Sequence, residues 1–270
     1  MPNAKDKHGD TSNNILIFGH TGAGKTTQFL TLPGRKFAYL FDPNALDSLA
    51  GFDVEYEEFL PDKLNLAVKS LSTEANKKAQ PSKLKTVQSY QNWEKHFETN
   101  LESGYFDQFD AILFDSITTF SDMVMDEVLR LNSREGQWPQ QDDYGPQMNA
   151  IMKVFRVLTS MGKTVYATGH MELVKDETSG RIVYQPLVTG RLKTKLPLLF
   201  SQIFALHAEA GQDKKVNYKL QTKPDRQTPL IRCTWRNLSN MEPVDIDFNK
   251  PIEGQGLGGI LAKHLASKPV

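Results

Sequence analysis

Short apolar runs that end in a polar residue recur along the first 170 residues of the chain. These runs are NILIF from Asn14, KFAYLFD ending at Asp42, FDAILFD ending at Asp115 and KTVYATGH ending at His170. Segments with helical spacing separate them, and the clearest helix, over 146–161, follows a proline start. Alternating strands and helices are typical of a mostly parallel sheet with helices on both faces. The pattern therefore predicts an α/β fold.

The pattern changes after His170. The segment MELVKDETSGRIVYQP predicts a β-hairpin with Ser179 and Gly180 near its tip. Further strands are expected around SQIFALH, VNYKLQT and LIRCTW, which add an antiparallel extension to the sheet toward the C-terminus. The expected parts of the chain are a flexible tail over 1–13, a core over 14–240 and a C-terminal extension over 241–270.

Composition and charge narrow the class of protein. The 32 Lys and Arg residues equal the 32 Asp and Glu residues, so no overall basic field favours non-specific binding of nucleic acid. The lone Cys233 cannot form an internal disulfide or a cysteine-rich zinc site, which suits a reducing compartment. No apolar run approaches the roughly 18 residues of a membrane span, and the polar start is unlike a signal peptide. We therefore expect a soluble cytoplasmic protein with no membrane partner.

A glycine-rich octet, GHTGAGKT, lies between the first predicted strand and a helix start at Lys25. It fits the G-x-x-x-x-G-K-[ST] pattern, in which main-chain N–H groups surround phosphates, the lysine reaches the β- and γ-phosphate oxygens and the Ser/Thr hydroxyl contacts Mg²⁺. The helix N-terminus adds partial positive charge. A plain glycine-rich turn is the alternative. The predicted nucleotide-binding residues are Gly19, His20, Thr21, Gly22, Ala23, Gly24, Lys25, Thr26 and Thr27.

Two other strand ends carry candidate chemistry. Asp115 ends an apolar strand, and ligands of parallel α/β sheets bind at the carboxyl ends of strands. Its carboxylate suits the Mg²⁺ that Thr26 contacts, and capping of the next helix is the alternative role. His170 stands at another strand end, where it either senses the γ-phosphate or is a satisfied surface histidine. The expected cofactors are ATP and Mg²⁺.

Taken together, these segments resemble the core domain of RecA-like recombinases, especially the small phage-encoded ATPases used in single-strand annealing and recombination. KFAYLFDPNALDSLAG is similar to the second-strand region of that family, AILFDSITTF to its Walker B strand and VYATGHME to its sensor strand. LVTGRLKTKLPLLFSQIFALHAE is similar to the segment after the second DNA-binding loop. The resemblance covers residues 14–236 and implies a RecA-like P-loop ATPase fold.

The resemblance also implies a homo-oligomeric ATPase that acts on single-stranded DNA in the cytoplasm of a phage's bacterial host, with a single-strand-binding protein as a further partner. VNYKLQTKPDRQTPL lies where the family carries basic residues that reach across a subunit interface, which assigns that role to Lys223 and Arg226. Asn44 lies near the place of the family's glutamate general base, and His170 stands where the family has glutamine. Because an amide cannot accept a proton from water, we expect slow hydrolysis or another base such as Asp42.

Two segments are candidates for contact with DNA. Residues 132–145 carry Arg134, Trp138 and Tyr144, which offer one cation and stacking surfaces for bases, although two aspartates oppose this role. Residues 172–195 have several cations and few acids, so they suit a phosphate backbone better. Solvent-exposed loop charge is the alternative for both. The cations of the second segment are Lys175, Arg181, Arg191, Lys193 and Lys195.

Two other functions stay open at the level of sequence. A nucleoside or nucleotide kinase would share the phosphate-binding loop, but it needs an arginine-rich lid, and the basic residues late in the chain form no compact lid. A nucleotide-gated assembly or loading factor would share the loop without needing segments that bind DNA. Stimulation of ATP hydrolysis by DNA favours recombination, whereas stimulation by a monophosphate favours the kinase.

Overall fold

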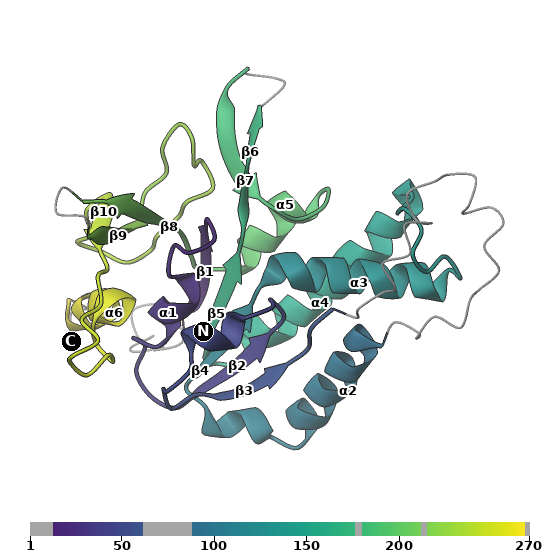
Figure 1. Cartoon of the computed structure of the whole chain (residues 1–270), viewed down its shortest axis with the longest axis horizontal. Coiled ribbons are helices and arrows are strands. Elements are labelled where there is room, and N and C mark those ends of the chain that lie inside the picture. The colour runs from purple at the N-terminus through teal and green to yellow at the C-terminus, as the bar shows by residue number, and fades with distance from the viewer. Residues whose placement is uncertain (1–12, 62–87, 176–179, 212–214, 268–270) are drawn as a thin grey trace, which may run out of the picture.

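A central β-sheet organises the computed structural model, which describes residues 13–61, 88–175, 180–211 and 215–267 (Figure 1). Within these residues the sheet has eight strands in the order β10-β9-β8-β1-β5-β4-β2-β3. The strands from β8 to β3 run parallel, and β9 and β10 are antiparallel to their neighbours. Their bounds are β1 Asn14–Gly19, β2 Lys36–Leu40, β3 Glu55–Glu58, β4 Ala111–Asp115, β5 Thr164–Gly169, β8 Gln202–Ala210, β9 Val216–Gln221 and β10 Met241–Pro243.

Most of the expected strands are present. The four apolar runs that end in polar residues form β1, β2, β4 and β5, so the predicted mostly parallel sheet with an antiparallel extension is confirmed. The prediction of a strand at LIRCTW is wrong. This segment forms one isolated β-bridge, between Arg232 and Ile203. Two residues further on, the main-chain N–H of Thr234 donates to the side chain of Gln202 at 2.9 Å. The side chain of Gln202 thus replaces the main-chain partner that Thr234 would have in a continuing strand.

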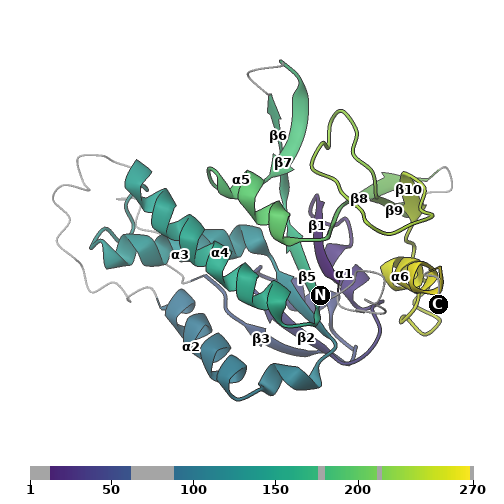
Figure 2. The ribbon, with the colours of Figure 1, turned by 180° about the vertical axis from the view of Figure 1, so that it is seen from behind.

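Helices cover both faces of the sheet. In Figure 1, α1 and α6 lie in front of it, and in the reverse view of Figure 2, α3 and α4 lie in front. The buried residues of β1 alternate accordingly: Leu16 and Phe18 pack with α2, α3 and α4, whereas Ile15 and Ile17 pack with α1 and α6. The α-helices are α1 Lys25–Phe29, α2 Ser89–Glu102, α3 Ile117–Leu131, α4 Tyr144–Ser160, α5 Leu192–Lys195 and α6 Gly256–Ala266. The 3₁₀ turns are η2 Ala45–Ser48, η4 Tyr105–Gln108, η5 Gln141–Asp143 and η6 Leu196–Leu199.

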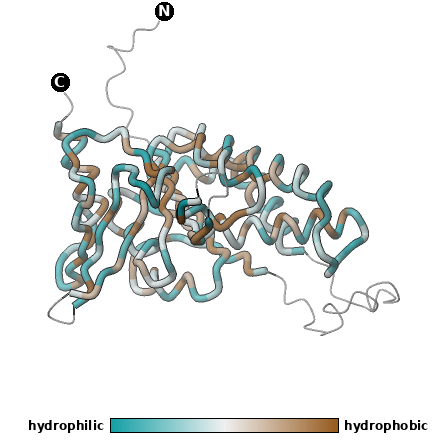
Figure 3. The backbone as a smooth tube through the Cα atoms, turned by 90° about the horizontal axis from the view of Figure 1, so that it is seen from above, coloured by the Kyte–Doolittle hydropathy of each residue, from teal (hydrophilic) through white to brown (hydrophobic). Residues whose placement is uncertain are grey.

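Burial follows from this arrangement. The most hydrophobic stretches of backbone gather in the middle of the molecule, and hydrophilic stretches lie around the rim (Figure 3). The helix predicted over 146–161 is α4, and its apolar stripe is buried in the core, where Ile151, Phe155 and Leu158 are fully enclosed. No helix among the described residues has the length and apolar character needed to cross a membrane.

The predicted β-hairpin is confirmed. Strand β6, Met171–Lys175, pairs antiparallel with β7, Ile182–Pro186, as a separate two-stranded sheet. Figure 1 shows that it projects away from the central sheet. Part of its tip, including Ser179, lies outside the described residues.

The C-terminal segment is packed on the core. Strand β10 joins the central sheet next to β9, and α6 lies against α1. The side chain of Gln28 in α1 fixes this contact, because its Oε1 accepts the main-chain N–H of Leu257 at 2.9 Å. Of the predicted N-terminal tail, residues 1–12 lie outside the described residues.

Candidate nucleotide-binding site

The glycine-rich octet forms the turn between β1 and α1. Gly24 adopts φ 85°, a left-handed conformation that side chains other than glycine rarely take. At Gly19 a Cβ would lie 2.7 Å from the carbonyl oxygen of Leu206 in the neighbouring strand β8. The first glycine thus allows close approach to β8, and the later one allows the turn into α1. This strand–turn–helix geometry is the one that the phosphate-binding pattern requires.

Lys25 lies inside this turn. Its side chain is buried, and Nζ donates to the carbonyl oxygens of Gly19 and His20, each at 3.0 Å. Burial lowers the pKa of Lys25, while the nearby carboxylates of Asp115 and Asp42 act in the opposite direction. The side chain therefore places a cationic group against the main chain of the turn, next to two carboxylates.

Asp115 is the centre of the buried polar contacts. Its Oδ2 accepts a hydrogen bond from Thr26 Oγ1 at 2.6 Å, and its Oδ1 accepts one from Thr168 Oγ1. Burial raises the pKa of Asp115, outweighing these hydrogen bonds and the charge of Lys25. Asp115 does not cap the next helix, which was its alternative role. The N-cap of α3 is Ser116, whose Oγ accepts the N–H of Thr119 at 3.4 Å.

Thr26 and Asp115 fit Mg²⁺. A hydroxyl and a carboxylate are hard oxygen ligands of the kind that this ion takes, and the two side chains already touch. A magnesium ion bound to a nucleotide needs only one or two protein oxygens, since phosphates and water complete its shell. Thr26 and Asp115 would hold the ion.

Strand order explains why these groups meet. Strand β5 lies between β1 and β4, with Phe18 of β1 opposite Gly169 and Phe114 of β4 opposite Ala167. The carboxyl ends of the three strands therefore form one edge of the sheet. The sequence reasoning missed Thr168, although its place near the polar end of KTVYATGH was an available signal.

Asp42 and His170 form a second contact at this edge. His170 Nε2 lies 3.3 Å from Asp42 Oδ2, and Asp42 Oδ1 accepts hydrogen bonds from Ser116 Oγ at 2.8 Å and from Thr119 Oγ1. Burial favours a higher pKa for Asp42, but the hydrogen bonds from His170, Thr119 and Ser116 outweigh it and hold the pKa below its usual range. Ser116 and Thr119 were also missed by the sequence reasoning.

Asn44 contributes no group to this contact network. It caps the short turn η2 with φ 66°, and it is exposed. Neighbouring Ala45 instead ties the turn to the strand end, because its N–H donates to the carbonyl oxygen of Asp42 at 3.2 Å. The side chain at the end of β2 that enters the site is Asp42.

The projecting hairpin is joined to the site at its base. His170 directly precedes β6, and its carbonyl oxygen accepts the N–H of Leu187, just after β7, at 2.9 Å. The ring of His20 in the glycine-rich turn meets the ring of Tyr184 in β7 edge to face, with centroids 5.7 Å apart. The hairpin therefore contacts both the glycine-rich turn and His170.

The predicted DNA-contacting cations differ in their surroundings. Arg134 is largely buried and forms an ion pair with the buried carboxylate of Asp143. Lys193 Nζ lies 2.5 Å from Glu172 Oε1. The exposed members of the set are Lys175, Arg181, Arg191 and Lys195. The hairpin and α5 therefore present exposed positive charge, whereas Arg134 is engaged within the fold.

Lys223 and Arg226, predicted to act across a subunit interface, lie in the exposed turn after β9. The intervening Asp225 shapes this turn, because its Oδ1 accepts the N–H groups of Gln227 and Thr228, each at 2.7 Å. Asp225 therefore stabilises the turn, while Lys223 and Arg226 lie exposed at the surface. Their proposed action on a neighbouring subunit stays a prediction.

Comparison with known proteins identifies the family. A family model described as "AAA domain" matches residues 11–229. The chain belongs to this family of P-loop ATPases. The predicted P-loop ATPase core is therefore confirmed. No curated protein sequence matches the chain.

Proposed function

We propose that this AAA-domain protein is a Mg²⁺-dependent ATPase whose reaction takes place at the carboxyl edge of β1, β5 and β4. The contact between Thr26 and Asp115 carries the proposal, because it joins the phosphate-binding turn to a buried carboxylate at a neighbouring strand end. Lys25, buried in the same turn, adds the cation that phosphate groups need. Membership of a P-loop ATPase family supports nucleotide binding and hydrolysis.

Each side chain has a task in this proposal. Lys25 neutralises phosphate charge, while Thr26 and Asp115 hold Mg²⁺. When bound, the ion polarises phosphoryl oxygens and offsets the charge that develops as the terminal phosphoryl group is transferred. Thr168 fixes the orientation of the Asp115 carboxylate through its hydrogen bond to Oδ1.

His170 and Asp42 act on the attacking water. Asp42 is a weak base, because both of its oxygens are engaged and its pKa is held below the usual range. It is therefore a positioning residue that orients the imidazole of His170. We assign to His170 the role of holding the water or accepting its proton, a role that geometry and hydrogen bonding can give to a histidine.

The test is release of inorganic phosphate from ATP with and without Mg²⁺. Asp115→Asn should retain much of the nucleotide affinity but lose Mg²⁺-dependent hydrolysis, since an amide is a poorer ligand for a hard cation. Asp110→Asn is the matched control: Asp110 precedes the same strand and accepts the N–H of Arg35 at 2.8 Å, which an amide oxygen can also do. Full Mg²⁺-dependent activity of Asp115→Asn would contradict the proposal.

The same assay separates the competing functions. Nucleoside monophosphates are added in parallel with single-stranded DNA. Stimulation and phosphorylation of a monophosphate would identify a kinase. Hydrolysis that responds to neither addition would favour an assembly or loading factor.

A second proposal concerns DNA. We propose that the chain is RecA-like and phage-encoded, and that it acts as a homo-oligomer on single-stranded DNA in recombination or annealing. The contacts of the projecting hairpin with His20 and His170 support it, because they give bound nucleotide a route to the exposed cations of the hairpin and α5. In this proposal Lys223 and Arg226 face a neighbouring subunit, and a single-strand-binding protein is a further partner.

The trans role has its own test. Lys223→Ala subunits are mixed with Lys25→Ala subunits, and the ATPase activity of the mixture is compared with that of each variant alone. Recovery of activity supports action across an interface. Absence of recovery in mixtures that co-assemble would assign Lys223 to the surface of its own subunit.

A further inference from the structure

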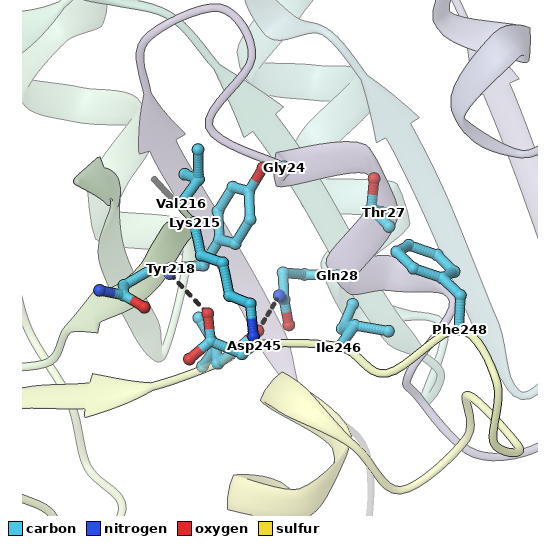
Figure 4. Close-up of a pocket in the computed structure, with 11 residues that line it drawn as sticks. Gly24, Thr27, Gln28, Lys215, Val216, Tyr218, Asp245, Ile246 and Phe248 are labelled. Atoms are coloured by element: carbon cyan, nitrogen blue, oxygen red, sulfur yellow. Dashed lines mark hydrogen bonds between the residues drawn. The ribbon is translucent and has the colours of Figure 1, made fainter. Parts of the chain in front are cut away.

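A pocket of about 430 Å³ opens beside the phosphate-binding turn. Three parts of the chain line it: the start of α1 with Gly24 and Thr27, the start of β9 with Tyr218, and the segment after β10 with Ile246 and Phe248 (Figure 4). Its size lies within the range of small-molecule sites. The last of these parts lies beyond residues 11–229, which the family model matches.

The C-terminal wall of the pocket is attached to the helix of the phosphate-binding turn. Gln28 Nε2 donates to the carbonyl oxygen of Val244 at 2.6 Å, while Gln28 Oε1 accepts the N–H of Leu257. The residue after Leu257 adds a further contact, because the N–H of Gly258 donates to Thr31 Oγ1 at 2.9 Å. The pocket is therefore formed by a segment that the core itself holds in place.

The chemistry of the pocket suits a flat aromatic ligand with a polar edge. Two ring carbons of Tyr218 lie 3.5 and 3.6 Å from the point where a Cβ on Gly24 would be, so this ring covers the end of the phosphate-binding turn. Phe248 stands at the far end of the pocket from Tyr218, with Ile246 between them (Figure 4). Asp245 adds a polar edge, and its Oδ1 accepts the N–H of Tyr218 at 2.8 Å.

We propose that this pocket binds the base and ribose of the nucleotide whose phosphates lie on the turn, and that Tyr218 and Phe248 contact the base. The inference rests on the proposed nucleotide binding at the turn and adds the part of the ligand that the turn does not reach. A purine is favoured over a pyrimidine, because its fused rings offer a larger face for aromatic contact. In this proposal the segment after β10, which lies beyond the residues that the family model matches, determines which base the pocket prefers.

Calorimetric titration with two probes tests the inference. ATP carries a base, and inorganic tripolyphosphate carries only the phosphate chain; both are titrated with Mg²⁺ into the full chain. Tyr218→Ala should weaken ATP binding about tenfold, the order expected when one base-stacking ring is lost. Its affinity for tripolyphosphate should stay within about twofold, and the wild-type preference for ATP over UTP should shrink.

Three further variants complete the test. Tyr218→Phe keeps the ring and should keep ATP affinity. Phe248→Ala removes a side chain that is 63% exposed, so it should fold and should weaken ATP alone. Tyr56→Ala is the matched control, since Tyr56 is an exposed strand tyrosine on β3, at the opposite edge of the sheet.

The failures are distinguishable. If Tyr218→Ala and Phe248→Ala leave ATP affinity unchanged, or weaken both probes equally, the pocket is not the base site although the turn binds phosphate. If the wild type binds neither probe, or if Lys25→Ala leaves tripolyphosphate affinity unchanged, the proposed function fails and the inference fails with it.

Discussion

The carboxyl edge of the sheet and the projecting hairpin differ in how their polar side chains are held. At the edge, Lys25, Asp115 and Thr168 are buried, and each is hydrogen-bonded to another part of the site. On the hairpin, the polar residues Lys175 and Arg181 are exposed, and even the apolar residue Leu173 is 56% exposed. Groups fixed before a ligand arrives suit electrostatic catalysis, because they need little reorganisation during reaction. The exposed side chains of the hairpin are not buried in this way.

The largest effect is expected at the edge. Lys25→Ala should lower kcat/KM for ATP hydrolysis about a thousandfold, at the upper end of what loss of one preorganised donor costs. The matched control is Lys36→Ala, which removes an equally buried lysine whose Nζ donates to the carbonyl oxygen of Gly34 at 2.8 Å. Lys36 begins β2, so it lies at the amino edge of the parallel strands, away from the site.

Steady-state phosphate release and circular dichroism check both lysine variants. A folded Lys25→Ala protein with unchanged nucleotide affinity and turnover would remove the phosphate-binding assignment. Equal losses in the two variants would show that burial of a lysine, rather than its place in the turn, matters to the protein.

The second effect separates chemistry from binding within the edge. His170→Ala should lower kcat about a hundredfold with a small change in KM, because the imidazole acts on water in the proposed reaction. Asp42→Asn should give a smaller loss in kcat, since it alters the orientation of His170 and leaves the imidazole in place. His207→Ala is the control, a histidine of β8 whose Nε2 lies 3.1 Å from Gln221 Oε1. If the His170→Ala variant had the kcat of the wild type, His170 would have no role in the reaction.

The main residues of the site at the carboxyl edge could be predicted from sequence, because each belongs to a short continuous motif. The octet around Lys25 matches a phosphate-binding pattern within eight consecutive residues, and Asp115 ends an apolar run that predicts a strand end at the carboxyl edge. Thr168, Ser116 and Thr119 were missed, because a threonine or serine near a strand end or helix start has many structural roles. Only the strand order, with β4 between β5 and β2, shows that Thr168 reaches Asp115 and that Ser116 and Thr119 reach Asp42.

Other features depend on contacts between distant segments. The pairing of Arg134 with Asp143 is hidden in a loop whose charges and aromatic residues suggest a nucleic-acid surface. The pocket wall after β10 depends on Gln28, which is more than two hundred residues away in the chain. The strand expected at LIRCTW satisfied the apolar pattern, but a side chain of β8 took one of its main-chain partners. Such competition between side chain and main chain is not visible in a one-dimensional pattern.

The third effect tests the hairpin side of the comparison. If Arg181, Arg191, Lys193 and Lys195 each neutralise a phosphate of single-stranded DNA, affinity should fall with salt at a slope of roughly 0.7 per contact, and alanine at all four positions should flatten it. Binding should tighten with an ATP analogue relative to ADP. Fluorescence anisotropy of a labelled oligonucleotide across a salt series measures both.

Two single variants sharpen this test. Lys195→Ala should flatten the slope more than Lys193→Ala, because Lys193 is already paired with Glu172 and Lys195 is exposed. An identical slope in the wild type and the quadruple variant would remove these residues from a DNA site. Lack of any DNA binding by the wild type would favour the kinase or the assembly factor.

The smallest effect concerns Arg134, which sequence reasoning placed with the DNA-contacting cations and the structure pairs with a buried aspartate. Asp143 also accepts the N–H of Gln140 at 2.6 Å and Asn132 Nδ2 at 3.0 Å. The hydrogen bond from Arg134, followed by that from Gln140, holds the pKa of Asp143 below its usual range. A lowered pKa in the folded state stabilises the protein above the unfolded-state pKa, and this contribution is lost as pH falls through the folded value.

Arg134→Ala should therefore lower the melting temperature by a few degrees at pH 7 and leave the affinity for single-stranded DNA unchanged. The difference in melting temperature between variant and wild type should shrink as pH falls below about 4, where Asp143 begins to take up a proton in the unfolded chain. Arg156→Ala is the control, because Arg156 is an exposed arginine of α4. Thermal melts across pH and anisotropy at one salt concentration measure the two properties. Weakened DNA binding with an unchanged melting temperature would contradict this prediction. It would show that Arg134 binds DNA and that its ion pair with Asp143 does not stabilise the fold.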